Sequence, residues 1–257
     1  MGLIPADRQR QILALIAQDG VVQVQELSER FEVSVLTIRR DLDYLAEQGF
    51  IERTHGGATL RRSLPIEPSY AQKSIEFPVE KRAIAKAVNH LIEDGDTLFI
   101  NSGSTTLEVI KALKGRDVTI VTNNIDAAWV ANEEALFRLI LVGGIYRNRS
   151  HSVSGGLAEP VIQQIFANKA IIGVDGFSLT SGLTTPVVEE AETTRQMIER
   201  TVGKVIVVAA SHKIGVLSNF STVDATHIDI LVTDEGGRKL LSLAELKEKG
   251  IELIIAQ

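Results

Sequence analysis

The chain has 257 residues, of which 44% are hydrophobic and 23% are charged. Both fractions are close to the average for globular proteins, which excludes a wholly disordered chain, and the length suggests one large domain or two smaller ones. No apolar run approaches the roughly 18 residues of a membrane-spanning helix, and the first residues lack the apolar core of a secretory signal, so we expect a cytoplasmic protein. Cysteine is absent, which excludes disulfides, cysteine-ligated zinc and thiol catalysis.

The formal net charge of −6 disfavours non-specific binding to polyanions, because that affinity depends on the neutralisation of phosphates. Contact with DNA therefore requires a local basic surface. The five histidines show no spacing typical of metal ligands, so we expect neither a metal ion nor another cofactor.

Residues 5–60 predict three helices followed by a β-hairpin. Apolar residues at helical spacing indicate a first helix and a short second helix over residues 24–31. Ser34 is expected to cap the third helix. Two short strands flank residues 54–57, whose glycines can adopt positive φ angles. We therefore expect residues 1–60 to form an α+β domain of the winged helix-turn-helix type.

The third predicted helix has the properties of a DNA recognition helix. Its apolar face carries Val35, Ile38, Leu42 and Leu45, whereas Asp41 is expected to turn inward toward an arginine or a helix terminus. On such a helix an arginine can bridge guanine O6 and N7 in the major groove, and the hairpin acts as a wing on the backbone or minor groove. The residues expected to contact DNA are Ser34, Leu36, Thr37, Arg39, Arg40, Tyr44, Arg53, His55 and Gly56.

The remaining sequence predicts a linker and a second domain. Residues 61–79 hold three of the six prolines and are expected to form a semi-rigid linker with a short helix around Tyr70. Residues 80–257 alternate between β-branched apolar runs and helical segments, which predicts an α/β, Rossmann-like domain with a parallel sheet and helices on both faces. Trp129 is expected to pack its helix against that sheet. The predicted strands are 97–100, 118–121, 138–142, 170–174, 205–209, 228–232 and 252–255, and the predicted helices are 80–92, 105–113, 125–132, 159–166, 187–201 and 243–249.

Polar and glycine-rich residues follow several of these strands, where parallel sheets form their ligand crevice. Residues 102–106 follow a strand and open a helix, so their amides can bind a phosphate at the positive end of the helix dipole. Lys213 and Arg147 can oppose phosphate charge, and Asp175 can accept hydrogen bonds from sugar hydroxyls. The residues expected at this site are Ser102, Gly103, Ser104, Thr105, Thr106, Thr122, Asn123, Gly143, Gly144, Arg147, Asp175, Gly176 and Lys213.

Residues 33–58 resemble the winged helix-turn-helix of the DeoR family of bacterial sugar-metabolism repressors. The matching residues are Val33, Ser34, Thr37, Ile38, Arg39, Arg40, Asp41, Leu42, Gly49, Arg53, His55, Gly56, Gly57 and Ala58. The second domain resembles the sensor domain of that family, which is similar to ribose-5-phosphate isomerase. The matching positions there are Ser102 to Thr106, Thr122, Asn123, Gly143, Gly144, Asp175, Gly176, Gly182, Leu183, Lys213, Thr233 and Asp234.

The resemblance implies a sequence-specific transcriptional regulator, in the first instance a repressor of a carbohydrate-metabolism operon. Its partners are then double-stranded operator DNA and a phosphorylated sugar or related metabolite that releases it from the operator. Because helix-turn-helix proteins usually read two-fold sites, a homodimer or homotetramer is expected. An activator with the same architecture, and an effector that acts as a corepressor, stay open as alternatives.

Two residues depart from the family pattern. Asn101 and Ala210 stand where the family usually carries Asp, which leaves the identity of the effector open.

One alternative function is that of an enzyme. A sugar-phosphate isomerase fused to a DNA-binding module would need a carboxylate base near the substrate carbon. The isomerase spacing, counted back from Lys213, leads to the neighbourhood of Arg195, and Glu189, Glu190 and Glu192 lie close by. We therefore assign no catalytic residue.

Overall fold

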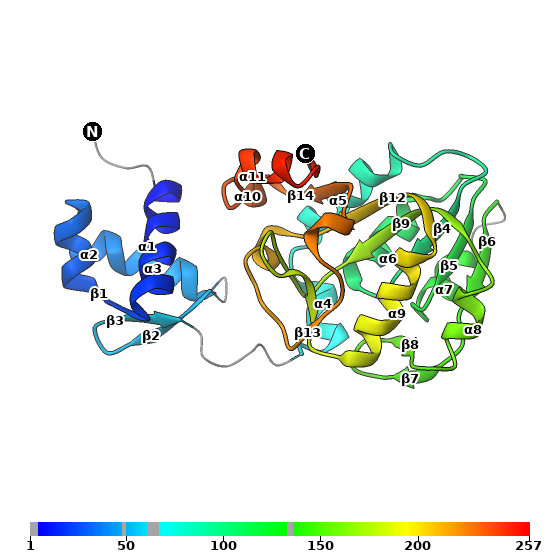
Figure 1. Ribbon diagram of the computed structural model, residues 1–257, viewed down its shortest axis with the longest axis horizontal. Coiled ribbons are helices and arrows are strands. Elements are labelled where there is room, and N and C mark those ends of the chain that lie inside the picture. The colour runs from blue at the N-terminus through cyan, green and yellow to red at the C-terminus, as the bar shows by residue number, and fades with distance from the viewer. Residues whose placement is uncertain (1–4, 48–49, 61–66, 133–135) are drawn as a thin grey trace. The chain divides into compact units, whose positions relative to one another are not determined.

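The computed structural model describes residues 5–47, 50–60, 67–132 and 136–257 (Figure 1). The chain divides into two compact units, residues 1–64 and 65–257. In the described part of the chain, no helix combines the length and the apolar character needed to cross a membrane. The expected order of an α+β unit followed by an α/β unit is confirmed.

The first unit contains the three predicted helices and the predicted hairpin. The helices are α1 (Pro5–Asp19), α2 (Val24–Phe31) and α3 (Val35–Glu47). Strands β2 (Ile51–Thr54) and β3 (Gly57–Leu60) form the hairpin, and an additional strand, β1 (Val21–Gln23), pairs with β3. A side chain at Gly57 would place its Cβ 1.8 Å from the Val22 carbonyl oxygen, so the close approach of β1 requires glycine there.

The predicted apolar face of α3 forms the core of this unit. Ile38, Leu42 and Leu45 are fully buried among residues of α1, α2 and β2. Asp41 lies on the inner side of the same helix, where the Nε of Arg8 donates to its Oδ2 at 2.6 Å. The inward orientation expected for Asp41 is therefore confirmed. Gly49, which the sequence places at the end of α3, lies outside the described residues.

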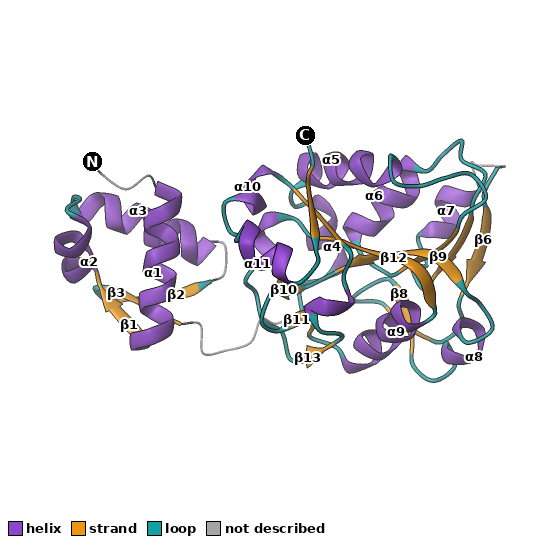
Figure 2. Cartoon of the chain, turned by 45° about the horizontal axis from the view of Figure 1, so that its top comes forward, coloured by secondary structure: helices purple, strands orange, loops and turns teal. Residues whose placement is uncertain are grey.

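The second unit is built on a seven-stranded parallel sheet (Figure 2). The strand order is β15-β14-β12-β9-β4-β5-β6, and every neighbouring pair is parallel. The strands are β4 (Thr97–Ile100), β5 (Thr119–Thr122), β6 (Arg138–Leu141), β9 (Ala167–Gly173), β12 (Thr201–Val208), β14 (Ile230–Thr233) and β15 (Glu252–Ile255). All seven predicted strands are thus present, with ends shifted by a few residues.

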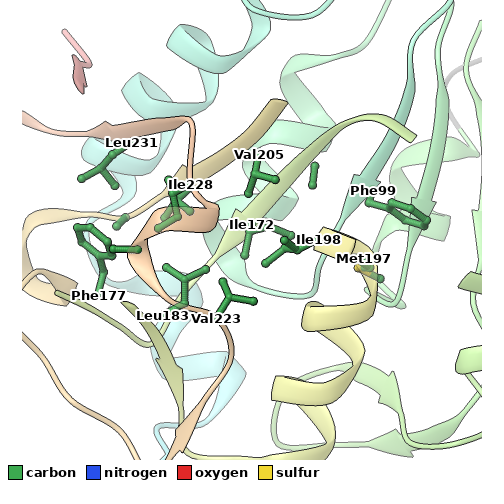
Figure 3. Packing of buried hydrophobic residues seen from close by; sticks show 14 of the residues in the cluster. Phe99, Ile172, Phe177, Leu183, Met197, Ile198, Val205, Val223, Ile228 and Leu231 are labelled. Atoms are coloured by element: carbon green, nitrogen blue, oxygen red, sulfur yellow. The ribbon is translucent and has the colours of Figure 1, made fainter. Parts of the chain in front are cut away.

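Helices cover both faces of this sheet, as predicted. They are α5 (Pro78–Asn89), α6 (Ser104–Ala112), α7 (Ala127–Ala131), α8 (Glu159–Ile162), α9 (Val188–Glu199), α10 (Glu235–Arg238) and α11 (Leu243–Glu248). Residues of α5, α6 and α7 pack on one face, and residues of α8, α9 and α11 pack on the other. Figure 3 shows part of the second of these layers, in which Met197 and Ile198 of α9 belong to the same buried cluster as Ile172 of β9. The predicted helix at 159–166 ends at Ile162, and α10 was not expected.

Two of the sequence-based expectations need correction or refinement. Trp129 does not pack α7 against the sheet, since its side chain is 77% exposed. The predicted linker over residues 61–79 is described only from residue 67 onward, and there it forms α4 (Tyr70–Ile75) and the start of α5 within the second unit.

Short antiparallel strands extend beyond the main sheet and were not predicted. Strands β7 (Ile145–Arg147) and β8 (Ser152–Ser154) form one ribbon. Strands β10 (Gly176–Ser178), β11 (Gly182–Thr185) and β13 (Phe220–Ser221) form a second small sheet. Both follow carboxyl ends of strands of the main sheet, so they build up the edge where a ligand crevice is expected.

Two aspartates of α3, Asp41 and Asp43, provide a test of the first unit. We expect Asp41→Ala to destabilise it by about 3 kcal/mol, because the change removes the carboxylate from a buried ion pair with Arg8. The matched control is Asp43→Ala, which removes a half-exposed carboxylate from its pair with Arg53 and should cost at most about 1 kcal/mol. Native-state hydrogen exchange in peptides of α1 and α3 measures both. Equal effects of the two variants would contradict this assignment.

Candidate functional site

The outer face of α3 carries the side chains expected to contact DNA. Leu36 is 58% exposed and Tyr44 is 41% exposed, and Arg39 and Arg40 are exposed beside them. The expected face is therefore formed and is open to solvent. Two arginines next to apolar groups match what a major-groove surface needs, namely guanine readout and contact with thymine methyl groups.

The start of α3 is fixed by two hydroxyl groups. The backbone amide of Thr37 donates to Ser34 Oγ at 3.1 Å, which confirms Ser34 as the N-cap. The two hydroxyl groups of Ser34 and Thr37 are hydrogen-bonded to each other at 2.8 Å. Both residues thus hold the first turn of the helix in place, and they lie where a recognition helix meets the phosphate backbone.

The predicted wing is tied to the recognition helix by Arg53. Its Nε lies 2.9 Å from Asp43 Oδ1, and its guanidinium also donates to the Gly57 carbonyl oxygen at 2.7 Å. Arg53 therefore compensates the negative charge of Asp43. His55 and Gly56 are exposed in the turn of the hairpin, and the Gly56 backbone is hydrogen-bonded to Thr54 and Val24.

A pocket opens in the second unit at the carboxyl ends of β4 and β9. The chain continues from β4 to β5 and β6 on one side, and it continues from β9 to β12, β14 and β15 on the other. Such a reversal leaves a crevice between the two central strands. Its cavity volume is about 80 Å³, several times the space that one water molecule occupies. Seven of the expected residues line it: Ser102, Gly103, Ser104, Thr105, Thr106, Asp175 and Lys213.

The N-terminus of α6 is held rigidly against this pocket. Asn123 accepts a hydrogen bond from the Ser102 amide at 2.7 Å and donates to the Val153 carbonyl oxygen at 3.1 Å. Thr106, fully buried, donates from its hydroxyl to the Gly103 carbonyl oxygen at 3.0 Å. The amides of the first turn are therefore presented in a fixed arrangement, which suits an anion such as phosphate.

Asp175 is the central charged group of the pocket. Its Oδ1 lies 2.7 Å from Lys73 Nζ and 3.8 Å from Lys213 Nζ, and its Oδ2 accepts from Thr185 at 3.0 Å. Burial would raise the pKa of Asp175, but the two lysine charges and the hydrogen bonds from Lys73 and Thr185 outweigh it and hold the pKa below its ordinary value. Asp175 thus stays a carboxylate and a hydrogen-bond acceptor.

The two lysines beside Asp175 differ in how much of their charge is compensated. Burial would lower the pKa of Lys73, but the close carboxylate of Asp175, with help from more distant Glu190, raises it. Burial and the charge of Lys73 lower the pKa of Lys213, because the attraction of Asp175 only partly offsets them. The charge of Lys213 is therefore less compensated than that of Lys73, and an additional anion in the pocket would compensate it further.

His212 is a further pocket residue that the sequence did not suggest. Its ring stacks on Phe77 at a centroid distance of 4.1 Å. Burial, together with the charges of Lys213 and Lys81, lowers the pKa of His212 to about 3. The imidazole is therefore neutral at physiological pH and adds no charge to the pocket.

The other expected residues lie around the pocket and do not line it. Thr122 and Asn123 are buried at the end of β5. The Asn123 side chain accepts from the Ser102 amide just before α6, and the Thr122 hydroxyl oxygen accepts from the Asn124 amide. Gly143 and Gly144 connect β6 to β7. Arg147 donates to Glu67 and to Glu190, each at 2.9 Å. A Cβ at position 176 would lie 2.3 Å from the Val216 carbonyl oxygen, which accounts for Gly176 by close packing.

The two departures from the expected pattern have different surroundings. The Asn101 side chain accepts from the Gly173 amide at 2.8 Å and donates to the Gly173 carbonyl oxygen at 2.9 Å, so it joins the ends of β4 and β9. A carboxylate there would lack the donor that the carbonyl oxygen needs. Ala210 follows β12 in the sequence and lines the pocket, and its methyl group occupies less space there than an Asp side chain would.

Several pocket residues were missed by reasoning from the sequence. Tyr70, Lys73 and Glu76 come from the predicted linker, Lys81 comes from the predicted helix over residues 80–92, and Glu190 comes from α9. One signal was available: Ser69 and Gln72 form a capping box, which marks the start of α4. The sequence contains no signal that this helix packs beside Asp175, which lies about a hundred residues further along the chain.

Comparison with known proteins agrees with both units. The family model described as a DeoR-like helix-turn-helix domain matches residues 8–63, and the model described as the DeoR C-terminal sensor domain matches residues 76–235. The chain belongs to the DeoR family. It is a DNA-binding transcriptional repressor of that family, as its resemblance in sequence implied.

Individual relatives match along nearly the whole chain. A putative aga operon transcriptional repressor of Escherichia coli O157:H7 is 35% identical, over 97% of this chain and 93% of that protein. The glycerol-3-phosphate regulon repressor of Escherichia coli is 37% identical, over 86% of this chain and 90% of that protein. Among solved structures, ribose 5-phosphate isomerase A from Neisseria gonorrhoeae is 14% identical with a TM-score of 0.39, over 52% of each chain.

The depressed pKa of His212 predicts a pH-dependent stability of the second unit. In the unfolded chain histidine takes up a proton near pH 6.5, whereas folded His212, with a pKa of about 3, does not. Stability is therefore fully present above pH 6.5 and is lost as the pH falls toward 3. Between pH 6 and pH 5 the free energy of unfolding should fall by about 1 kcal/mol more than in His212→Phe, which keeps a ring on Phe77. Urea unfolding at both pH values tests this, and parallel slopes would contradict it.

Proposed function

We propose that the chain represses a carbohydrate-metabolism operon and that a phosphorylated sugar or a related metabolite, bound in the pocket at β4 and β9, changes its affinity for operator DNA. The observation that carries this proposal is the joint placement of the α6 N-terminus and Lys213 in one pocket. For Lys213 Nζ the nearest anionic atom among the described residues is Asp175 Oδ1, at 3.8 Å. An ammonium group in this position has donors to offer to a ligand.

The chemistry of the pocket favours a ligand with an anionic end and a hydroxyl-bearing end. The amides of residues 103–106 and Lys213 suit the phosphate, whereas the Ser102 amide is already bonded to Asn123. Asp175 is held as a carboxylate, so it can accept hydrogen bonds from hydroxyl groups of the same ligand. A relative named as a glycerol-3-phosphate regulon repressor supports a ligand of this class.

We infer that the pocket binds its ligand without turning it over. The position where an isomerase of this type would carry its base is occupied by Arg195, which donates to the Thr222 and Ser221 carbonyl oxygens. Glu190 lines the pocket, but one of its oxygens, Oε1, accepts from both Arg147 and Ser152. Conversion of a pentose phosphate by the purified protein, abolished by Glu190→Gln, would favour the enzyme instead.

On the DNA side, we propose that α3 enters the major groove and that the β2–β3 wing contacts the flanking backbone. The bases would be read by Arg40, Leu36 and Tyr44, with Arg39 beside them. Ser34, Thr37 and Arg53 would position the helix, and His55 and Gly56 would approach the phosphates. Such proteins read two-fold sites, so we also propose that the active form is a homodimer or homotetramer.

The main test measures binding of a DNA fragment from upstream of the protein's own gene by fluorescence anisotropy, at fixed salt. We expect one phosphorylated compound from a panel of triose, pentose and hexose phosphates to weaken binding, and a compound that strengthens it would identify a corepressor. Lys213→Met should bind the DNA normally but lose at least about tenfold in sensitivity to that compound, because a charge-assisted hydrogen bond is lost. A Lys213→Met protein with unchanged sensitivity would remove Lys213 from the ligand site.

The recognition helix is tested with the arginine at its centre. We expect Arg40→Ala to cost about 1–3 kcal/mol at the operator and to relax base preference at one position, because a contact to a base edge is lost. Arg30→Ala is the matched control, since Arg30 is an exposed arginine on α2. The same anisotropy assay on operator variants measures both. Equal losses on operator and random DNA would instead assign Arg40 to phosphate contact.

A further inference from the structure

The segment from residue 67 to residue 81, here called the strap, forms one wall of the ligand pocket. It contains α4 and the first residues of α5. Tyr70, Lys73, Glu76 and Lys81 all line the cavity. In the sequence the strap follows the DNA-binding unit directly after residues 61–66. The wall of the pocket thus begins directly after the residues that connect it in sequence to the DNA-binding unit.

The strap is held to the body of the second unit by stacking and by a backbone hydrogen bond. The Tyr70 ring stacks on His151 with a centroid distance of 4.5 Å, and the Tyr70 amide donates to the Arg149 carbonyl oxygen at 2.7 Å. Near its other end, Phe77 stacks on His212. These contacts hold the strap at both ends of α4.

Two sets of ion pairs connect the strap to walls of the pocket. Lys73 pairs with Asp175 at 2.7 Å. Glu67 accepts from Arg147, which also donates to Glu190, so the first described residue of the strap is linked to a second pocket carboxylate. All these side chains are at least three-quarters buried, where ion pairs are screened little by salt. A change in charge inside the pocket therefore acts directly on the strap.

We propose that the strap senses occupancy of the pocket: an anion held by the α6 N-terminus and Lys213 is also bound by Lys73, and it thereby stabilises the docked strap. This inference rests on the proposed function. Lys73 Nζ and Lys213 Nζ approach the same oxygen of Asp175, so one anionic group can reach both ammonium groups. Contacts between the ligand and the strap exist only while the strap is docked, so the ligand favours that state.

Lys73 is assigned this role and Lys81 is not. The Nζ of Lys81 donates to the Glu76 carbonyl oxygen at 2.6 Å and to the carbonyl oxygen of Lys73. These are carbonyl groups at the C-terminal end of α4, which a cation stabilises. Lys81 therefore joins α4 to α5, whereas the ammonium group of Lys73 faces the pocket and the carboxylate of Asp175.

The test measures hydrogen exchange in the full-length protein, with inorganic phosphate as the probe and chloride at equal ionic strength as the reference. We expect phosphate to slow exchange in peptides that cover residues 102–107 and also in peptides that cover residues 69–77. At a phosphate concentration ten times its dissociation constant, exchange through opening of the site should slow about tenfold. The readout is the ratio of exchange rates without and with phosphate.

Three variants separate sensing from simple packing. In Lys73→Met the ratio for residues 69–77 should fall toward one, and Lys73→Arg should restore it because the charge is kept. Lys86→Met, which changes an exposed lysine of α5, should leave the ratio as it is. The wild-type and Lys73→Arg proteins keep the test valid if Lys73→Met folds poorly.

The possible results distinguish this inference from the proposed function. Protection of residues 102–107 without protection of residues 69–77 would overturn sensing by the strap and leave the ligand site intact. Full strap protection in Lys73→Met would overturn the role of Lys73. Failure of phosphate to protect either segment would overturn the anion site, and with it both the proposed function and this inference.

Discussion

The position of the ligand pocket depends on a single constraint, the reversal of strand order between β4 and β9. Neighbouring parallel strands normally have their connecting loops on the same edge, and these loops cover one another. Here the chain leaves β4 in one direction and β9 in the other, so the space above their carboxyl ends stays open. Asn101 bonds both backbone groups of Gly173 and keeps these two ends together. The rigid first turn of α6 and the carboxylate of Asp175 take their positions from this junction.

Local neutralisation of carboxylates explains how a chain with a net charge of −6 can present sites for anions. In α3, Asp41 is paired internally with Arg8, and Asp43 is paired with Arg53. In the pocket, Asp175 is compensated by Lys73. Because electrostatic forces between exposed charges decay over about 8–10 Å at physiological salt, the pairing of nearby charges matters more than the total. The acidic residues elsewhere on the surface therefore do not prevent binding of a phosphate or of DNA at these two places.

The sequence was informative wherever a residue's role depends on its near neighbours in the chain. The burial of Ile38, Leu42 and Leu45 follows from helical periodicity, and Ser34 was recognised as a cap by its position. The run from Ser102 to Thr106 was recognised because it lies between a strand and a helix.

Roles that depend on distant segments could not be predicted. Lys73 acquires its role from its ion pair with Asp175, which lies 102 residues further along the chain. The packing of Gly176 against the Val216 carbonyl oxygen depends on the small antiparallel sheet of β10, β11 and β13, for which the sequence contains no clear signal. Trp129 was expected in the core because it is large and apolar, but α7 has only five residues and turns that side chain to solvent.

The magnitude of the interactions at the strap is sufficient for regulation. Coupling free energies between two binding sites are typically about 1–3 kcal/mol. A single hydrogen bond to a charged group contributes about 1.5–3 kcal/mol, so one bond between Lys73 and a ligand, made only when the strap is docked, covers that range. In the proposed coupling, a contact that exists only while the strap is docked contributes more than a tighter contact to the α6 N-terminus that both arrangements share. Under this proposal, affinity is set by α6 and Lys213, and response is set by the strap.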